Sequence, residues 1–177
     1  GVLLATPAPV SAGLVEPIHP RFAHSLRAVA YYPVAGVIAE YDRAVFSSSV
    51  RALVFDAHEP VSNAGAYGIN DLHIVRYTFS GKVARPYISM PVPDEELVRF
   101  GEAALNKHIY VDSRHRRRFV VRRYNPGLCA YTPSHGSFLE NMRTEIGHVQ
   151  GLHVTGDYVQ GASIEACFRS AKDAVSH

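Results

Sequence analysis

The sequence predicts an α/β fold of the mixed (α+β) kind, and three observations support this. The chain has 177 residues, of which 47% are hydrophobic and 19% charged, a composition typical of a globular domain with a real core. Runs rich in β-branched and aromatic residues in the middle of the chain predict strands. The chain also opens on a short apolar strand and closes on a strand, a turn and a helix.

The first half of the sequence predicts short helices followed by a series of strands. Proline is tolerated in the first turn of a helix because the N–H group there has no acceptor within the helix, so helices are expected to begin at Pro9 and Pro20. Glycine and asparagine cluster between two of the strands and predict a loop. In chain order we expect strand Val2–Ala5, helices Pro9–Val15 and Pro20–Ala30, strands Val34–Tyr41 and Val50–Asp56, a loop over Ser62–Asn70, and strands Leu72–Phe79 and Tyr87–Met90.

The second half of the sequence predicts longer helices. Three acidic residues after Pro93 face the positive end of the helix dipole, so a helix is expected from Pro93 to about Lys107. The remaining expected elements are a strand core at Phe119–Val121, a helix within Ser134–Gly147, strand Leu152–Thr155, a glycine-rich turn, and a helix from Ser163 to Val175.

Positive charge is concentrated in one segment of the chain. Six arginines fall within ten residues, whereas the rest of the chain carries a net negative charge: Arg114, Arg116, Arg117, Arg118, Arg122 and Arg123. Nucleic-acid modules usually interleave aromatic residues with the basic ones or present a recognition helix, so no nucleic-acid partner is expected. A solvated strand edge or a patch facing a protein partner is favoured. An anionic substrate or a membrane surface is the alternative, and the membrane is not expected.

Metal and disulfide chemistry are not expected. The ten histidines show no His-x-x-x-His spacing, and the two cysteines, Cys129 and Cys167, lack the number and spacing of a zinc site or a disulfide framework. A reduced, cytoplasmic setting is the default expectation. Because the chain does not begin with Met and its first residues already form a strand, we expect a proteolytic product or a piece of a longer chain.

The C-terminal segment carries the features of a ligand site. The strand Leu152–Thr155 delivers the chain to Gly156, where the missing side chain lets a flat ligand approach the backbone. Asp157 follows at the carboxyl end of that strand, where open α/β sheets place ligand contacts. Ser163 is a typical N-cap and Glu165 a typical first-turn acid, and the free N–H groups of this helix end can receive negative charge.

The helix that follows carries an apolar face, formed by Ile164, Cys167, Phe168 and Ala171 at helical spacing. From the residues alone, a plain strand–turn–helix that packs this face into a core is the alternative to a ligand site.

The same segment resembles a known signature. Gly156-Asp157, followed by Gly161-Ala-Ser163-Ile164-Glu165-Ala166, is similar to the C-terminal flavin-binding motif of the monoamine oxidase, protoporphyrinogen oxidase and phytoene desaturase superfamily. The resemblance implies FAD as the cofactor. It implies that Gly156 and Asp157 lie by the ribityl–phosphate part of FAD. The backbone of Ser163, Ile164 and Glu165 would face the pyrimidine edge of the isoalloxazine ring.

Two weaker similarities extend the resemblance along the chain. Val2 to Ala8, with Thr6 and Pro7, is similar to the strand with which these enzymes re-enter the cofactor domain. The segment from Arg123 to Pro133 aligns with a Trp-containing family segment, but Tyr124 stands where Trp is usual. Tyr124 and Tyr131 are therefore the candidates for the aromatic wall beside the flavin. The alternative is that both tyrosines pack at a sheet edge.

The resemblance also implies a division of the chain and a missing part. Residues 1–15 and 148–177 would belong to the FAD-binding domain, and residues 16–147 to the substrate-binding domain. Family members begin with Gly-x-Gly-x-x-Gly, which places the pyrophosphate on a helix N-terminus, and this motif does not occur in the sequence. A second polypeptide that carries the motif is therefore the expected partner.

The expected function is that of a subunit of an FAD-dependent oxidoreductase that is active only with its partner chain. It would transfer a hydride from a small organic substrate, an amine, an amino acid or an isoprenoid or polyene, to flavin N5. The alternative is a non-catalytic scaffold or regulatory subunit of a flavoenzyme complex.

Overall fold

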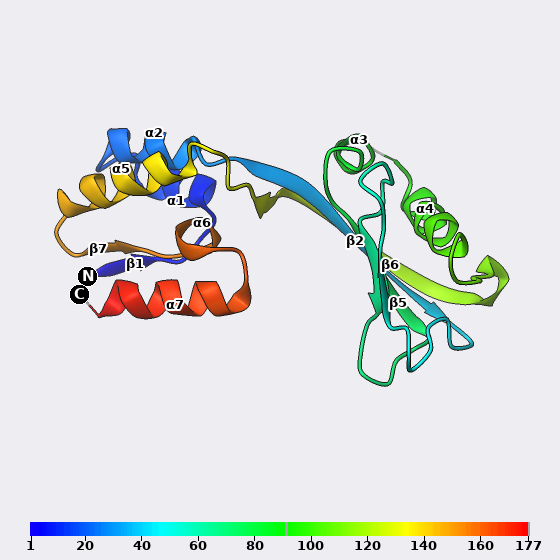
Figure 1. Cartoon of the computed structure of the whole chain (residues 1–177). Coiled ribbons are helices and arrows are strands. Elements are labelled where there is room, and N and C mark those ends of the chain that lie inside the picture. Colours follow the sequence, from blue (N-terminus) through cyan, green and yellow to red (C-terminus); the bar gives the residue numbers. More distant parts are fainter. Residues whose placement is uncertain (91, 177) are drawn as a thin grey trace. The chain divides into compact units, whose positions relative to one another are not determined.

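The structure, a computed structural model, describes residues 1–90 and 92–176. The chain divides into two compact units: unit 1 comprises Gly1–Tyr31 and Leu128–His177, and unit 2 comprises Tyr32–Gly127. Both ends of the chain therefore fold together in unit 1, where the first and last strands lie side by side (Figure 1). The mixture of helices and sheets agrees with the predicted mixed α/β fold class.

Unit 1 is built around two parallel strands. Strands β1 and β7 pair in parallel, with Val2 opposite Leu152 and Leu4 opposite Val154. Helices α1, α2 and α5 lie on one side of this pair and α7 on the other (Figure 1). The elements are β1 (Val2–Leu4), α1 (Ala8–Val15), α2 (Pro20–Arg27), α5 (His135–Gly147), β7 (Leu152–Val154), α6 (Asp157–Gln160) and α7 (Ile164–Val175).

The core of unit 1 lies between the strand pair and helices α1, α2 and α5. Its largest buried side chains are Phe22, Leu26 and Tyr158, which pack with Met142 and Leu152. Sequence reasoning assigned α2 and α5 to the substrate-binding part, whereas here they pack with the two end strands in one compact unit. Which part of the chain serves the cofactor and which the substrate stays a prediction.

The apolar face of α7 is exposed in this chain, which disagrees with the alternative that the helix packs this face into a core. Ile164 is 80% exposed and Phe168 is 74% exposed. The helix instead rests on the strands through the small residues Ala166 and Ser170, and Thr155 Oγ1 donates a hydrogen bond to Ser170 Oγ at 2.8 Å. Small side chains let the helix approach closely, and this leaves its larger apolar residues on the adjoining side.

Unit 2 is an antiparallel sheet with strand order β3-β4-β5-β2-β6. Strand β2 begins, and β6 ends, at the boundary between the two units. The elements are β2 (Tyr31–Tyr41), β3 (Ala52–Val54), β4 (Asn63–Ala66), β5 (Ile74–Phe79), α3 (Arg85–Ser89), α4 (Asp94–Asn106), a 3-10 turn η1 (Ser113–His115) and β6 (Arg116–Cys129).

One face of this sheet packs against α4. Register sets Val37 opposite Tyr77, and alternate residues along these strands are fully buried with Leu97 and Leu105 of α4. Gly101 allows the closest approach, because a Cβ atom at this position would lie 2.6 Å from the ring of Tyr77. We call this side of the sheet the helix face and the other side the open face.

A buried polar network also ties α4 to the helix face. The hydroxyls of Tyr41 and Tyr77 are hydrogen-bonded at 2.9 Å, and Tyr41 donates to Glu102 at 2.9 Å. Arg116 on β6 forms a 2.9 Å ion pair with the same carboxylate. A buried charge is stabilised when paired and hydrogen-bonded, so this network fixes α4 against three strands.

Three predicted elements differ from the structure. The expected loop at 62–70 contains strand β4, whose small residues Ala64 and Gly65 are buried between two neighbouring strands. Of the expected strand Tyr87–Met90, all residues but the cap Met90 lie in helix α3, because Pro86 occupies a first-turn position and the apolar run is too short to show a period. The expected strand core Phe119–Val121 belongs to a longer strand, β6.

Candidate functional site

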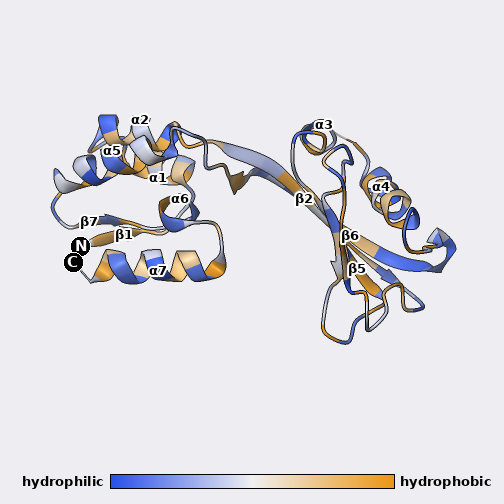
Figure 2. Ribbon diagram, viewed as in Figure 1, coloured by the Kyte–Doolittle hydropathy of each residue, from blue (hydrophilic) through white to orange (hydrophobic). Residues whose placement is uncertain are grey.

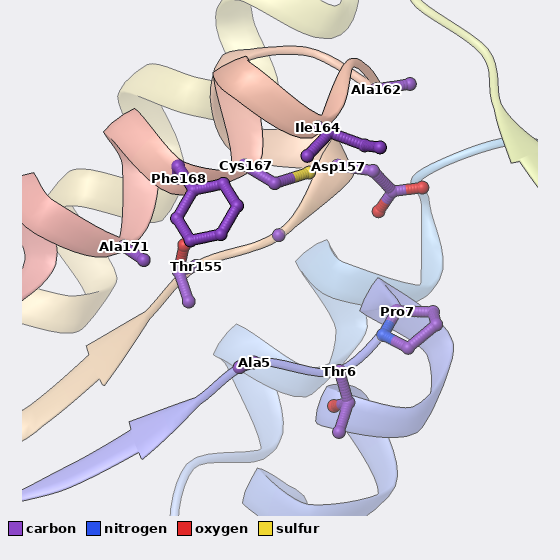
Figure 3. Close-up of a pocket in the computed structure, with 11 residues that line it drawn as sticks. Ala5, Thr6, Pro7, Thr155, Asp157, Ala162, Ile164, Cys167, Phe168 and Ala171 are labelled. Atoms are coloured by element: carbon purple, nitrogen blue, oxygen red, sulfur yellow. The ribbon is translucent and has the colours of Figure 1, made fainter.

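A cavity of about 420 Å³ lies in unit 1 at the carboxyl ends of the parallel strands β1 and β7. In parallel α/β sheets, ligands bind at this end of the strands. The lining comes from the segments that follow the two strands and from the first turns of α7 (Figure 3). The lining residues are Ala5, Thr6, Pro7, Thr155, Gly156, Asp157, Ala162, Ile164, Cys167, Phe168 and Ala171.

Gly156 gives the cavity part of its space. Its φ of +147° lies in a region that L side chains rarely adopt, and a Cβ atom would stand 3.0 Å from the Tyr158 ring. It would also lie 3.6 Å from the carbonyl oxygen of Thr6, at the end of the neighbouring strand. Glycine therefore leaves space between the two strand ends, and the approach of a flat ligand there stays a prediction.

Asp157 is held in place by a tyrosine from a distant part of the sequence. The Tyr31 hydroxyl donates to Asp157 Oδ1 at 2.7 Å and accepts from the backbone N–H of Ala8 at 3.2 Å. Burial, rather than the neighbouring carboxylate, is the main cause that raises the pKa of Tyr31 far above its usual value. Tyr31 therefore stays protonated and connects the start of α1 to the aspartate.

The first turn of α7 points into the same region. Ser163 is the N-cap, and its Oγ accepts from the backbone N–H of Ala166 at 3.1 Å. The first backbone N–H groups of a helix have no acceptor within it, so those of Ile164 and Glu165 are available to a ligand. The Glu165 side chain is turned away to Arg169, with which it forms an exposed 2.6 Å ion pair. Only the backbone of Glu165 can therefore serve the site.

The predicted site residues are partly brought together. Thr6, Pro7, Gly156, Asp157 and Ile164 line the cavity, and Ser163 caps the helix beside it. The residues thus come from two segments that are 150 positions apart in the sequence and meet because β1 and β7 pair.

The two tyrosines predicted to form an aromatic wall are not among the lining residues. Tyr131 is half-exposed, and its hydroxyl donates to the backbone carbonyl of Asp157. Its ring packs edge-on against His135, at 5.0 Å between ring centroids. Tyr124 lies on β6 in unit 2 and is 55% exposed. A role for either tyrosine beside the flavin stays a prediction.

Sequence reasoning missed three residues at this site. Tyr31 is 126 positions from Asp157, and nothing in its local pattern indicates that it bonds to a carboxylate. Phe168 and Cys167 were placed on the apolar face of the helix without a role at the site, and both line the cavity. The stripe was visible in the sequence; the direction in which it faces depends on how α7 rests on the strands.

Residues 1–90 and 92–176 contain neither a candidate metal site nor a candidate membrane span. No group of three or more His, Cys, Asp or Glu side chains is arranged to hold a metal ion there. Within the same residues, no helix combines the length and the apolar character needed to cross a membrane.

With this geometry in hand, the sequence can be assigned to a family. The chain belongs to the family of flavin-containing amine oxidoreductases, whose model matches residues 1–177. The family implies FAD as the cofactor, and the resemblance drawn from the C-terminal segment is confirmed. No curated protein sequence matches the chain significantly.

Solved structures share the fold at low sequence identity. The chain is similar to a protein of Exiguobacterium sp. 255-15 described as a protoporphyrinogen oxidase, with a TM-score of 0.77 and 20% identity. It is also similar to a reduced UDP-galactopyranose mutase, with a TM-score of 0.73 and 9% identity. The matches cover 99% and 97% of this chain but only 40% and 39% of the two structures. The chain thus spans about two fifths of the length of these relatives.

Proposed function

We propose that the chain is part of an FAD-dependent oxidoreductase that removes a hydride from a small organic substrate. The observation that carries this proposal is the cavity at the ends of β1 and β7, beside the first turn of α7, in a chain of the flavin-containing amine oxidoreductase family. Amines, amino acids and isoprenoids or polyenes are the candidate substrates. Bound FAD supplies the hydride acceptor, and the protein supplies position and electrostatics.

The residues present fit a flavin. The cavity is lined mostly by apolar side chains and by the backbone of Gly156, where a Cβ atom would intrude. Ile164 and Phe168 would cover apolar ring surface, and the backbone N–H groups of Ile164 and Glu165 would meet the electron-rich pyrimidine edge at the positive end of the helix dipole. Asp157, held by Tyr31, would accept hydrogen bonds from the hydroxyls of the cofactor chain.

A second polypeptide segment with the Gly-x-Gly-x-x-Gly motif would complete the site. The motif is absent from these 177 residues, and the solved relatives are about two and a half times as long as the part that this chain matches. Strand β1 is also incompletely buried, with Val2 58% exposed. Parallel strands are normally covered on both faces and paired within larger sheets, so a further parallel strand beside β1 is expected.

Anaerobic reduction tests the proposed activity. The native protein, with whatever completes it, is mixed without oxygen with a primary amine, an L-amino acid or a polyene, and its visible flavin absorption is followed. Bleaching by one class, and return of the colour when an electron acceptor is added, is the expected result. An FAD-containing protein that no class of substrate bleaches would contradict the oxidoreductase proposal and favour a scaffold role.

A matched control separates the site from general effects. Gly156→Ala places a methyl group against Tyr158 and should reduce the FAD content of the purified protein. Gly36→Ala is the control, because a Cβ atom at Gly36 meets nothing within 4 Å. Equal FAD content in the two variants would show that the cofactor lies elsewhere.

A further inference from the structure

A cavity of about 400 Å³ lies within unit 2, beside helix α4. Its lining comes from one continuous stretch of the chain, the second half of α4 and the segment that leads from there into η1. The chain is strongly hydrophilic at η1 and at the start of β6 (Figure 2). Arg99, Glu102 and Ala103 line the cavity from α4, and Tyr110 and Asp112 line it from the segment that follows.

Hydrogen bonds within this segment hold the walls of the cavity in place. The side-chain amide of Asn106 donates to the carbonyl oxygen of Val111 at 2.7 Å and accepts from the backbone N–H of Val111 at 2.6 Å. Asp112 accepts from the backbone N–H of Arg114 at 2.9 Å, and the same two residues form a 2.6 Å ion pair. These polar groups already have their partners, so they shape the cavity and leave its free chemistry to other side chains.

The carboxylate of Glu102 has one oxygen free for a further hydrogen bond. The side chain is only 7% exposed, and both of its contacts are to Oε1: Tyr41 donates to this oxygen at 2.9 Å, and Arg116 lies 2.9 Å from it. Within residues 1–90 and 92–176, Oε2 has no hydrogen-bond partner, and it is not among the unpartnered atoms that the protein encloses completely. Because buried polar groups normally have partners, this oxygen indicates a ligand that donates a hydrogen bond.

Arg99 provides a free positive charge at the same cavity. It lies three positions before Glu102 in α4, so the two side chains are neighbours on the helix surface. Arg99 is exposed and forms no ion pair in the described part of the chain. A guanidinium presents a planar fork of donors that matches a carboxylate or a phosphate. The cavity thus combines a buried acceptor with an exposed group that binds anions.

The surroundings of Glu102 favour a hydroxyl as the donor. Arg116 already lies against the carboxylate and would repel an ammonium group brought to it, whereas a neutral hydroxyl meets no such repulsion. The ring of Tyr110, which is 77% exposed, offers apolar surface to the carbon atoms of a ligand.

We infer that this cavity binds a small hydroxylated anion, a hydroxy acid or a phosphate ester of a polyol. A hydroxyl of the ligand donates to Glu102, and its anionic group lies on Arg99. The inference goes beyond the proposed function and does not depend on it, because every residue that carries it belongs to unit 2 and lies in one stretch of the chain.

Titration of the native protein with matched three-carbon compounds tests this inference. Glycerate and glycerol 3-phosphate are the probes, propionate and propyl phosphate lack their hydroxyls, and glycerol lacks their charge; the heat of binding is measured at low ionic strength. At least one probe should bind saturably and about tenfold more tightly than its counterpart without hydroxyls, and glycerol should not bind. The tighter probe distinguishes a carboxylate from a phosphate. Absence of saturable binding by both probes, or equal binding of a probe and its counterpart without hydroxyls, would overturn the inference.

Two variants that leave Glu102 unaltered locate the binding. Arg99→Ala should weaken binding of the probe about tenfold, because it removes a charge-assisted contact. Ala103→Leu fills the cavity from an exposed helical position that tolerates leucine, so it should weaken binding at least as much and leave the melting temperature unchanged.

Arg76→Ala is the matched control for the lost charge. Arg76 is exposed on β5, and its neighbours Val75 and Tyr77 are buried on the helix face, so its side chain lies on the open face, away from α4. This variant should bind the probe as the unaltered protein does. Equal weakening by Arg99→Ala and Arg76→Ala would indicate general charge attraction and would overturn the site.

Hydrogen exchange locates the ligand on the unaltered protein. Exchange should slow within residues 99–114 when the probe is saturating, and unchanged exchange there would contradict the site. The flavin content of the same samples keeps the two proposals separate. A flavoprotein that binds neither probe contradicts only this inference, whereas a protein that binds a probe at this cavity and releases no flavin supports the inference and contradicts the proposed function.

Discussion

Tyr31 and Asp157 form the contact on which the geometry of the candidate site depends most. The hydroxyl of Tyr31 serves two partners at once, the carboxylate of Asp157 and the backbone N–H of Ala8. Loss of this hydroxyl would leave both groups without their partner in a partly buried position. The position of Asp157 beside the cavity should therefore depend on a residue that lines no part of it.

Tyr31→Phe should lower the free energy of unfolding by about 1–2 kcal/mol, because a partly buried carboxylate and an N–H group lose their hydrogen bond. Urea unfolding measures the change. Tyr124→Phe is the control, since Tyr124 is exposed and its hydroxyl has no hydrogen bond in the described part of the chain. A loss of the same size in both variants would contradict the role given to Tyr31.

The two cysteines should differ in reactivity toward alkylating reagents. Burial, with the negative Asp157 nearby, raises the pKa of the Cys129 thiol to about 11. A shift of about two units leaves roughly a hundredfold less thiolate at neutral pH than an unperturbed thiol would have. Cys167 borders the cavity and is only partly buried. Iodoacetamide should therefore label Cys167 first.

The raised pKa of Cys129 also makes the stability of the folded state depend on pH. Because the folded state favours the neutral thiol of Cys129, the contribution of this thiol to stability is complete below about pH 9 and is lost as the pH rises to about 11.

Removal of FAD should accelerate the alkylation of Cys167 and leave that of Cys129 unchanged, as followed by mass spectrometry. Faster labelling of Cys129 than of Cys167 would be incompatible with the structure.

At the scale of elements, helix α7 illustrates how far the sequence could predict the site. Its start at Ser163, its N-cap and its apolar stripe were all predicted from local patterns. The side toward which these apolar side chains face was not predicted, because it depends on the small residues through which α7 packs on the strands. Likewise the segment of β4 was predicted as a loop because asparagine and glycine cluster over residues 62–70, and only pairing with β3 and β5 makes it a strand.

Ser163→Ala should destabilise α7 by about 1 kcal/mol, because the N–H of Ala166 loses its acceptor. The change is measured by urea unfolding, and the affinity for FAD should fall with it. Ser176→Ala at the other end of the helix removes only an exposed hydrogen bond to the Lys172 carbonyl. Equal FAD affinity in the two variants would argue against a cofactor at the start of α7.

The contact between α4 and the sheet gives a second test at this scale. Gly101→Ala should lower the free energy of unfolding by about 1–3 kcal/mol, because the new methyl group meets the Tyr77 ring. Gly13→Ala in α1 is the matched control. It has free space and an exposed position within the helix, so it should stabilise the protein by about 0.5–1 kcal/mol. Thermal unfolding of both variants measures the two changes in stability. Changes of the same sign would contradict the close contact between Gly101 and the Tyr77 ring.

In the whole molecule, unit 1 contains both ends of the chain and unit 2 contains its middle. Unit 1 brings the first and last strands together at the candidate cavity, and unit 2 forms an antiparallel sheet that packs one face against helix α4. The family assignment implies FAD, and we propose that a segment with the Gly-x-Gly-x-x-Gly motif, which these 177 residues lack, completes the site. Loss of either the cavity or the partner segment should therefore abolish cofactor retention.

The cofactor content of the native protein tests whether this chain helps to hold a flavin. The protein is purified together with whatever completes it, denatured, and the released small molecules are identified and quantified by mass spectrometry. One FAD for each copy of this chain is expected, and most of that FAD should be lost in Gly156→Ala but not in Gly36→Ala. A native, stably folded protein that releases no flavin would contradict the proposed flavin site.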